Sequence, residues 1–271
     1  MAGVAEDLQA RQAAVQALCP GADIAALLDK PNNNLAVEYC KAIIEQNVEM
    51  QPIALPRQGA DHGQALTESS HTAFASASAL RALWAEGGAA ALAPYVPQKA
   101  LKLYKQAEYD GKYMDFAVMG HCELALLRAA CAGQAPFAAV RGVSEGLEHR
   151  LENAVRETAS LPALLDALTT VRYPRARMRR LAMDAALGYT AQTPALPPYL
   201  HLLGARKEAL SLPGETALPL SHSLARLARE NETCAQMAAA QNRASDLGAL
   251  CRAKPEPMGG IYRQKIIFLT N

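Results

Sequence analysis

The stretch from Pro94 to Gly188 constrains the fold most, because it consists of successive segments with helical apolar spacing. Each segment is bounded by Pro, Gly or Ser, and these residues commonly begin or end helices. The spacing predicts five helices, over residues 95–108, 113–131, 144–157, 160–170 and 174–187. We therefore expect a helical domain in the middle of the chain.

The region before Pro94 mixes several patterns. Apolar residues recur at helical spacing over residues 5–19, over 24–28, and again after Asn34, which is expected to cap a helix that follows a turn at Pro31–Asn34. Met50–Leu55 alternates enough to predict a strand, which Pro56 ends.

A polar loop over residues 57–72 leads to one more helix in this region. That helix is expected to begin at Ser76 or Ser78 and to end at Gly87-Gly88. Strand, loop and helix in this order are typical of an α/β domain. We place its boundary near residue 90.

The chain beyond Gly188 is expected to form a small α/β part. Tyr199–Leu203 and Lys265–Leu269 are predicted strands, and residues 234–251 a predicted helix. The fold class is thus α/β plus α, with three expected domains, over residues 1–90, 91–190 and 191–271.

Composition narrows the class of protein without naming a partner. The 271 residues carry a formal charge of +1, so affinity for a polyanion requires a local patch. The six cysteines are scattered without a CxxC pair, which predicts reduced thiols and no metal site. No uncharged apolar run approaches the ~20 residues that span a bilayer, so we expect a cytoplasmic protein with no membrane partner.

The sequence contains one local patch of positive charge. Five arginines and no acid occur within nine residues: Arg172, Arg175, Arg177, Arg179 and Arg180. With Pro174 in the first turn of a helix, a helical wheel places an apolar face opposite the last four of these arginines. The predicted apolar face consists of Met178, Leu181, Ala182 and Ala185.

The arginine patch allows two interpretations. Guanidinium groups bind phosphate oxygens, which would make the patch a nucleic-acid contact, and Tyr173 could stack on an unpaired base. Alternatively, the arginines form a solvated face with ion pairs to acids of the preceding helix region. The candidate acids are Glu145, Glu148, Glu152 and Glu157.

Other residues are compatible with a phosphate site or with ordinary structure. Ser76, Ser78 and Arg81 surround an expected helix start, where hydroxyls and free amides bind phosphate, although a plain capped helix has the same pattern. Asn32 and Arg57 lie in predicted loops.

Further histidines and acids offer no catalytic set. Asp61, His62 and His71 allow acid–base chemistry or simple solvation. His121-Cys122-Glu123 has the H-x-E pattern of zinc deaminases without P-C-x-x-C, so we interpret it as helix. The catalytic residues stay unassigned.

Three segments in the first region match a known family in order and spacing: Lys30–Tyr39, Arg57–His62 and Ala75–Arg81. Further matches follow at Glu145–Leu151, Arg172–Leu181 and Pro198–Gly204. Over essentially its whole length the chain resembles the tRNA(Met) cytidine acetate ligase family.

The resemblance implies an enzyme that activates acetate with ATP as acetyl-adenylate and acetylates N4 of the wobble cytidine of elongator tRNA(Met). It implies a nucleotidyltransferase-like, Rossmann-like α/β domain, here partial, and a helical region that holds the tRNA. Mg²⁺ would accompany the ATP. The implied ATP contacts are Asn32, Arg57, Gln58, Ser76, Ser78 and Arg81, and the implied RNA contacts are Arg150, Arg172, Tyr173, Arg175, Arg177, Arg179 and Arg180.

The chain departs from the family at one motif. The family opens with a strand and an N-P-F-H-x-G-H loop that faces the ATP phosphates, and this sequence contains no such stretch. We therefore expect the C-terminal portion of such an enzyme, with residues 1–90 exposing apolar surface or dimerising to cover it. The alternatives are a non-catalytic RNA-binding scaffold and a helical interaction module with solvated arginines.

Overall fold

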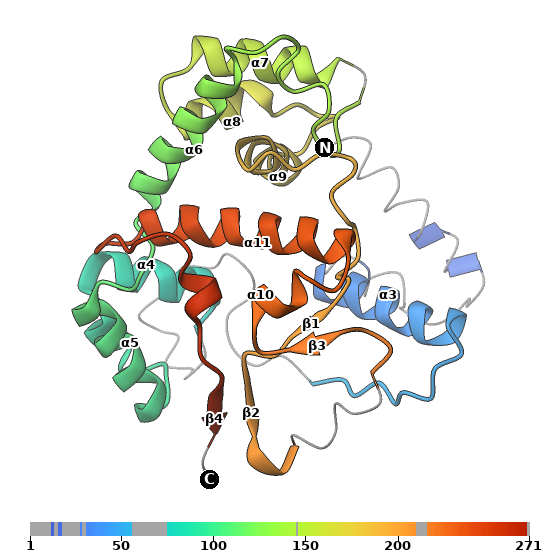
Figure 1. Cartoon of the computed structure of the whole chain (residues 1–271), viewed down its shortest axis with the longest axis vertical. Coiled ribbons are helices and arrows are strands. Elements are labelled where there is room, and N and C mark those ends of the chain that lie inside the picture. The colour runs from blue at the N-terminus through green and yellow to red at the C-terminus, as the bar shows by residue number, and fades with distance from the viewer. Residues whose placement is uncertain are drawn as a thin grey trace. The chain divides into compact units, whose positions relative to one another are not determined.

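The computed structural model describes residues 31–55, 75–144, 146–209 and 216–269, together with Gln12, Ala13, Gln16, Ala17 and Leu28 (Figure 1). The chain divides into two compact units. Unit 1 comprises residues 1–96 and 170–174, and unit 2 comprises residues 97–169 and 175–271. The division into three domains made from the sequence remains a prediction.

Unit 1 contains the helices α3 (Pro31–Glu45) and α4 (Ala77–Gly87) and the short 3-10 helix η1 (Ala89–Leu92). The predicted turn at Pro31–Asn34 is wrong, because α3 already begins at Pro31, a residue well tolerated in a first helical turn. Asn34 is therefore not an N-cap. Its amide Nδ2 donates to the carbonyl of Leu28 at 2.7 Å.

The predicted strand over Met50–Leu55 is also wrong. These residues have no regular secondary structure, and Ile53 and Leu55 are 81% and 87% exposed. Alternation over six residues is a weak signal when no neighbouring strand completes the hydrogen bonds. The described residues of unit 1 contain no strand, so they do not show the α/β character expected for residues 1–90.

The helix expected after Ser76 is confirmed as α4. The hydroxyl of Ser76 accepts from the amide of Ala79 at 3.2 Å and lies 3.0 Å from the hydroxyl of Ser78. Gly88 ends the helix with a positive φ of 66° and donates its amide to Trp84. The helix then packs on η1, whose Ala89 and Leu92 are buried.

The six helices predicted for unit 2 are all present, each within four residues of its expected bounds. They are α5 (Gln98–Asp110), α6 (Phe116–Ala130), α7 (Leu147–Glu157), α8 (Leu161–Leu168), α9 (Arg175–Ala186) and α11 (Glu232–Leu250). A four-residue helix, α10 (Leu224–Leu227), was not predicted.

Helices α6, α7, α8 and α9 pack together into one bundle (Figure 1). The apolar face predicted for α9 is confirmed, since Met178, Leu181, Ala182 and Ala185 are its buried residues. The side chains of Asp115 and Ser160 cap α6 and α8 by accepting backbone amide bonds at their first turns. The buried stripe on α9 therefore orients its arginines outward.

The start of α6 is attached to the far end of unit 2. The segment Gly111–Asp115 pairs with Cys251–Lys254, in which the amide of Asp115 donates to Cys251 and the amide of Lys254 donates to Gly111. Gly111 has a φ of +69°, and a Cβ there would lie 2.5 Å from the Lys254 side chain. Both the conformation and the close approach require glycine at this position.

The strands of unit 2 form two small parallel pairs. β1 (Leu200–His201) pairs with β3 (Leu220–Ser221), and β2 (Gly204–Arg206) pairs with β4 (Ile267–Leu269). The strands predicted near residues 200 and 267 are confirmed in shortened form. Beside them lies a small core of Tyr199, Leu224, Leu227, Cys234 and Ala238.

Candidate functional site

Four arginines of α9 form an exposed surface on unit 2. We call Arg175, Arg177, Arg179 and Arg180 the arginine face. All four side chains are exposed, whereas Met178 between them is fully buried. The helical register thus separates charge from core as the sequence predicted, and it presents guanidinium groups to solvent.

The arginines of this face have different surroundings. Arg175 forms an ion pair with Asp166 on α8. Within the described part of the chain, neither Arg179 nor Arg180 takes part in a hydrogen bond or an ion pair. Two guanidinium groups are therefore available for an external anion.

Two of the four acids proposed as partners for the arginines lie beside other side chains. Glu152 pairs with Arg156 at 2.8 Å, and Glu148 lies 3.8 Å from His149. Glu145 lies outside the described residues. Arg175 instead pairs with Asp166, an acid that the sequence had not indicated.

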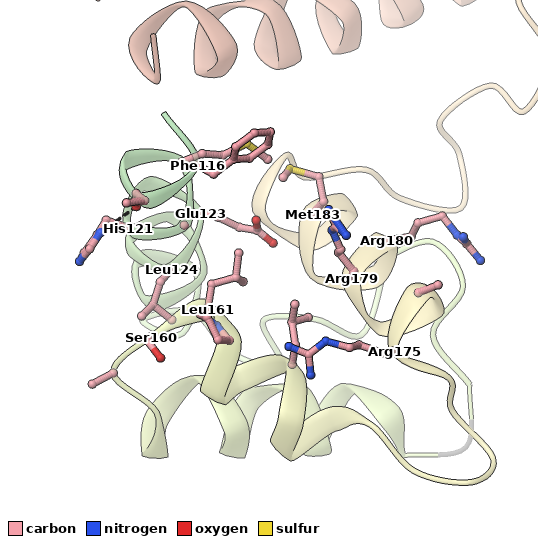
Figure 2. Close-up of a pocket in the computed structure, with 17 residues that line it drawn as sticks. Phe116, His121, Glu123, Leu124, Ser160, Leu161, Arg175, Arg179, Arg180 and Met183 are labelled. Atoms are coloured by element: carbon pink, nitrogen blue, oxygen red, sulfur yellow. Dashed lines mark hydrogen bonds between the residues drawn. The ribbon is translucent and has the colours of Figure 1, made fainter. Parts of the chain in front are cut away.

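A cavity of about 1130 Å³ opens between α6, α8 and α9 (Figure 2). Three residues of the arginine face line it: Arg175, Arg179 and Arg180. Its apolar walls include Phe116 on α6, Leu161 on α8 and Met183 on α9. The cavity therefore combines apolar surface with positive charge.

A carboxyl group that the sequence had not singled out also lines this cavity. Glu123 on α6 is 1% exposed, and its Oε1 has no hydrogen-bond partner among the described residues. Burial raises the pKa of Glu123 from 4.5 to about 7, and the nearby charge of Arg179 opposes this rise. Figure 2 shows the carboxyl pointing from α6 toward α9.

One signal in the sequence could have revealed Glu123. It lies beside Leu124 and one turn before Leu127, both buried, so it is an acid on the apolar face of its helix. The interpretation of His121-Cys122-Glu123 as helix was correct, and the side chain of His121 is exposed, with Nδ1 bonded to the carbonyl of Ala117 at 2.8 Å.

The remaining predicted RNA contacts lie outside α9. Arg150 on α7 donates to the carbonyl of Ala167 in the last turn of α8 at 2.6 Å. Arg172 and Tyr173 belong to the segment 170–174 of unit 1, where the Arg172 guanidinium lies 5.8 Å from the Tyr173 ring centre. Their assignment to RNA stays a prediction.

The predicted ATP contacts belong to unit 1. Asn32 is exposed in the first turn of α3, Ser76 and Ser78 lie at the start of α4, and Arg81 is exposed one turn later. Arg57 and Gln58 lie outside the described residues, as do Asp61, His62 and His71. The role of these residues in ATP binding stays a prediction.

The described residues contain neither a cluster of metal ligands nor a membrane-spanning helix. No group of three or more His, Cys, Asp or Glu side chains lies close enough to hold a metal ion. No helix in this part of the chain has the length and apolar character needed to cross a membrane.

The sequence matches the profile described as HIGH Nucleotidyl Transferase over residues 5–258. The chain belongs to the HIGH nucleotidyl transferase family. Because the match covers nearly the whole chain, both units are part of it.

Curated relatives of this nucleotidyl transferase chain are named tRNA(Met) cytidine acetate ligase. The protein of Listeria monocytogenes serotype 4b (strain CLIP80459) is 30% identical over 183 residues, which cover 67% of this chain and 45% of that protein. The protein of Geobacillus sp. (strain WCH70) is also 30% identical, over 65% of this chain and 45% of that protein. The resemblance drawn from the sequence is confirmed, and the chain spans less than half the length of these relatives.

Solved structures of Thermotoga maritima TmcAL share the fold of this nucleotidyl transferase chain. The apo structure, form I, superimposes with a TM-score of 0.77 at 20% identity and covers 92% of this chain and 63% of its own. The structure bound with alpha-thio ATP, form II, has a TM-score of 0.75 at 18% identity, over 91% of this chain and 62% of its own. At this identity the likeness establishes the fold alone.

Proposed function

We propose that this chain holds elongator tRNA(Met) through the arginine face of α9 and acts in the ATP-dependent acetylation of the wobble cytidine. The names of the curated relatives support the reaction and the tRNA. The alpha-thio ATP in the Thermotoga structure supports the nucleotide. The arginine face supports RNA as the ligand of unit 2.

The proposed reaction has two steps. An acetate oxygen attacks the α-phosphorus of ATP, pyrophosphate leaves, and acetyl-adenylate forms. The N4 amine of cytidine then attacks the acetyl carbonyl carbon and loses a proton, and AMP leaves. Hydrogen-bond donors and positive charge around the phosphates would stabilise the first transition state.

Residues of unit 1 are proposed for the ATP side. The start of α4 presents free amides beside the hydroxyls of Ser76 and Ser78, and such a helix start binds phosphate. Arg81, Asn32, Arg57 and Gln58 would add contacts to ATP, which Mg²⁺ would accompany. The catalytic residues stay unassigned.

The observation that carries the proposal is the exposure of Arg179 and Arg180 and their lack of bonds to described residues. Both side chains are exposed on α9, and neither has a hydrogen bond or an ion pair among the described residues, so both guanidinium groups can bind an external anion. Each phosphate that they neutralise releases counterions, so binding must weaken as salt rises.

A salt titration of tRNA binding tests this proposal. Arg179→Ala with Arg180→Ala should weaken binding to a tRNA(Met) transcript and reduce the slope of log K against log salt by about 0.7–0.9 per lost phosphate contact. The matched control is Arg226→Ala with Arg229→Ala, which removes two exposed arginines of unit 2 that lie on and just after α10. Equal slopes in the two double variants would reject the arginine face as the RNA contact.

A non-catalytic RNA-binding chain is the second candidate function. The arginine face is compatible with it, because RNA binding through guanidinium groups requires no ATP site. Acetate-dependent exchange of pyrophosphate into ATP separates the candidates. Exchange by the purified chain supports the ligase, whereas tRNA binding without exchange supports the non-catalytic protein.

A further inference from the structure

The cavity between α6, α8 and α9 has a feature that the arginine face alone does not explain. Its wall contains the carboxyl of Glu123, which is 99% buried and whose Oε1 has no partner among the described residues. A buried oxygen without a hydrogen bond costs free energy in the absence of a ligand. A ligand that donates a hydrogen bond would remove that cost.

The surroundings of Glu123 restrict the chemistry of such a ligand. Phe116, at the start of α6, lines the cavity and is 68% exposed, so its ring can stack on a flat ligand. Leu161 and Met183 supply apolar surface on the two other helices. In Figure 2, Phe116 and Met183 lie at one end of the cavity, and the Glu123 carboxyl lies between the helices.

The charged groups at the cavity add a requirement for negative charge. Arg175, Arg179 and Arg180 line it from α9, and Arg175 forms an ion pair with Asp166. Guanidinium groups bind phosphate oxygens well. A ligand with a flat ring, a hydrogen-bond donor on that ring and a phosphate group matches all three kinds of surface.

We propose that this cavity binds one unpaired nucleotide of the bound RNA whose base carries an exocyclic amino group. The amino group donates to Glu123, the base stacks on Phe116, and the phosphate lies on Arg179 and Arg180. Cytosine, adenine and guanine meet the requirement, whereas uracil offers carbonyl oxygens at the equivalent positions. The volume of about 1130 Å³ is large enough for a nucleotide.

The proposal deepens the proposed function and rests on it for the source of the nucleotide. The ligand chemistry itself is tested separately, with free CMP, AMP, GMP and UMP. The cavity contains two methionines, Met119 and Met183, while Met237 and Met258 lie elsewhere in unit 2. Methyl resonances of these four residues therefore report where a nucleotide binds.

Nuclear magnetic resonance of the full chain with labelled methionine methyl groups provides the test. At about pH 8, where the Glu123 carboxyl is mostly ionised, CMP, AMP and GMP should shift the Met119 and Met183 signals in a saturable way and leave Met237 and Met258 unchanged. UMP should bind at least tenfold more weakly. Equal affinity for UMP, or no shift of the cavity methionines, would overturn the proposal.

Two variants separate the contribution of the base contact at Glu123 from that of the phosphate contact at Arg179. Glu123→Gln should remove the discrimination against UMP, because an amide also donates a hydrogen bond, and Arg179→Ala should weaken all four nucleotides by a similar factor. Unchanged discrimination in a folded Glu123→Gln protein would reject the role of Glu123. Since Arg179 is exposed, its replacement should preserve the fold, so the second comparison measures nucleotide binding.

The two proposals fail in different ways. Nucleotide binding in the cavity without tRNA binding would reject the proposed function and retain the nucleotide site. Salt-dependent tRNA binding without any shift of Met119 and Met183 would retain the RNA function and reject the nucleotide site.

Discussion

Glu123 on α6 and Arg179 on α9 line the same cavity, and the positive charge of Arg179 opposes the rise in the pKa of Glu123. The opposition is incomplete, because burial of the carboxyl outweighs it. Arg175 and Arg180 line the cavity from the same helix as Arg179, His121 lines it from α6, and α8 contributes no charged side chain to it.

The raised pKa of Glu123 predicts a pH-dependent stability. A carboxyl that is easier to protonate in the folded than in the unfolded chain stabilises the fold below its unfolded pKa, near 4.5, and this contribution is lost as pH rises to about 7. Glu123→Gln should abolish this part of the pH dependence. Relative to wild type, the variant should gain stability between about pH 5 and pH 8, by about 3 kcal/mol at most.

Urea unfolding of both proteins at the two pH values measures this difference. Parallel changes in the free energy of unfolding of wild type and Glu123→Gln would contradict a raised pKa for this group.

The ion pair between Arg175 and Asp166 predicts a gain of RNA affinity on its removal. Asp166→Asn removes a negative charge beside the arginine face and releases the Arg175 guanidinium. The affinity for tRNA should rise by about twofold to fivefold, with a salt slope steeper by about 0.7–0.9. Fluorescence anisotropy measures both. Glu230→Gln, which removes an exposed negative charge elsewhere in unit 2, should leave affinity and slope near those of wild type.

Met178 is the fully buried side chain below the arginine face. Met178→Ala should destabilise unit 2 by about 2–5 kcal/mol, because it leaves a cavity between packed helices. Met258→Ala is the matched control, since Met258 is 73% exposed, and it should change stability by less than about 0.5 kcal/mol. Chemical denaturation compares the two variants. Similar losses would show that Met178 does not hold α9 in place.

Ser76 caps α4 through the amide of Ala79. Ser76→Ala should cost the helix about 1 kcal/mol and speed hydrogen exchange at the Ala79 amide. Ser78→Ala should have less effect on that amide, because Ser78 bonds the Ser76 hydroxyl and not the amide. Hydrogen exchange at α4 compares the variants. If both serines also contact ATP phosphates, each replacement should weaken ATP binding independently of its effect on exchange.

The elements that the sequence predicts well are those with a local cause. The apolar face of α9 follows from residue spacing alone, and the start of α4 follows from a serine that caps it. Met50–Leu55 was mispredicted because a strand depends on a partner that local alternation cannot supply. The parallel pairing of β2 with β4 joins segments far apart in the chain, so local sequence does not indicate it.

The candidate site was only partly predictable for the same reason. The arginine face is a property of one helix, and its exposure was expected from the sequence. The pairing of Arg175 with Asp166 and the burial of Glu123 depend on how α6, α8 and α9 pack. A single sequence shows an acid on the apolar side of α6, but it does not show which helix covers that side.

The bond from the Asp115 amide to the Cys251 carbonyl has a consequence for folding during translation. Cys251 directly follows α11 and is translated long after α6. The bond therefore cannot form until all of α11 has been synthesised. Helices α6 to α9 can assemble earlier, but the start of α6, with Phe116 beside the cavity, is anchored only after α11 has been made. A nascent chain therefore exposes the arginine face of α9 before the Phe116 side of the cavity is anchored.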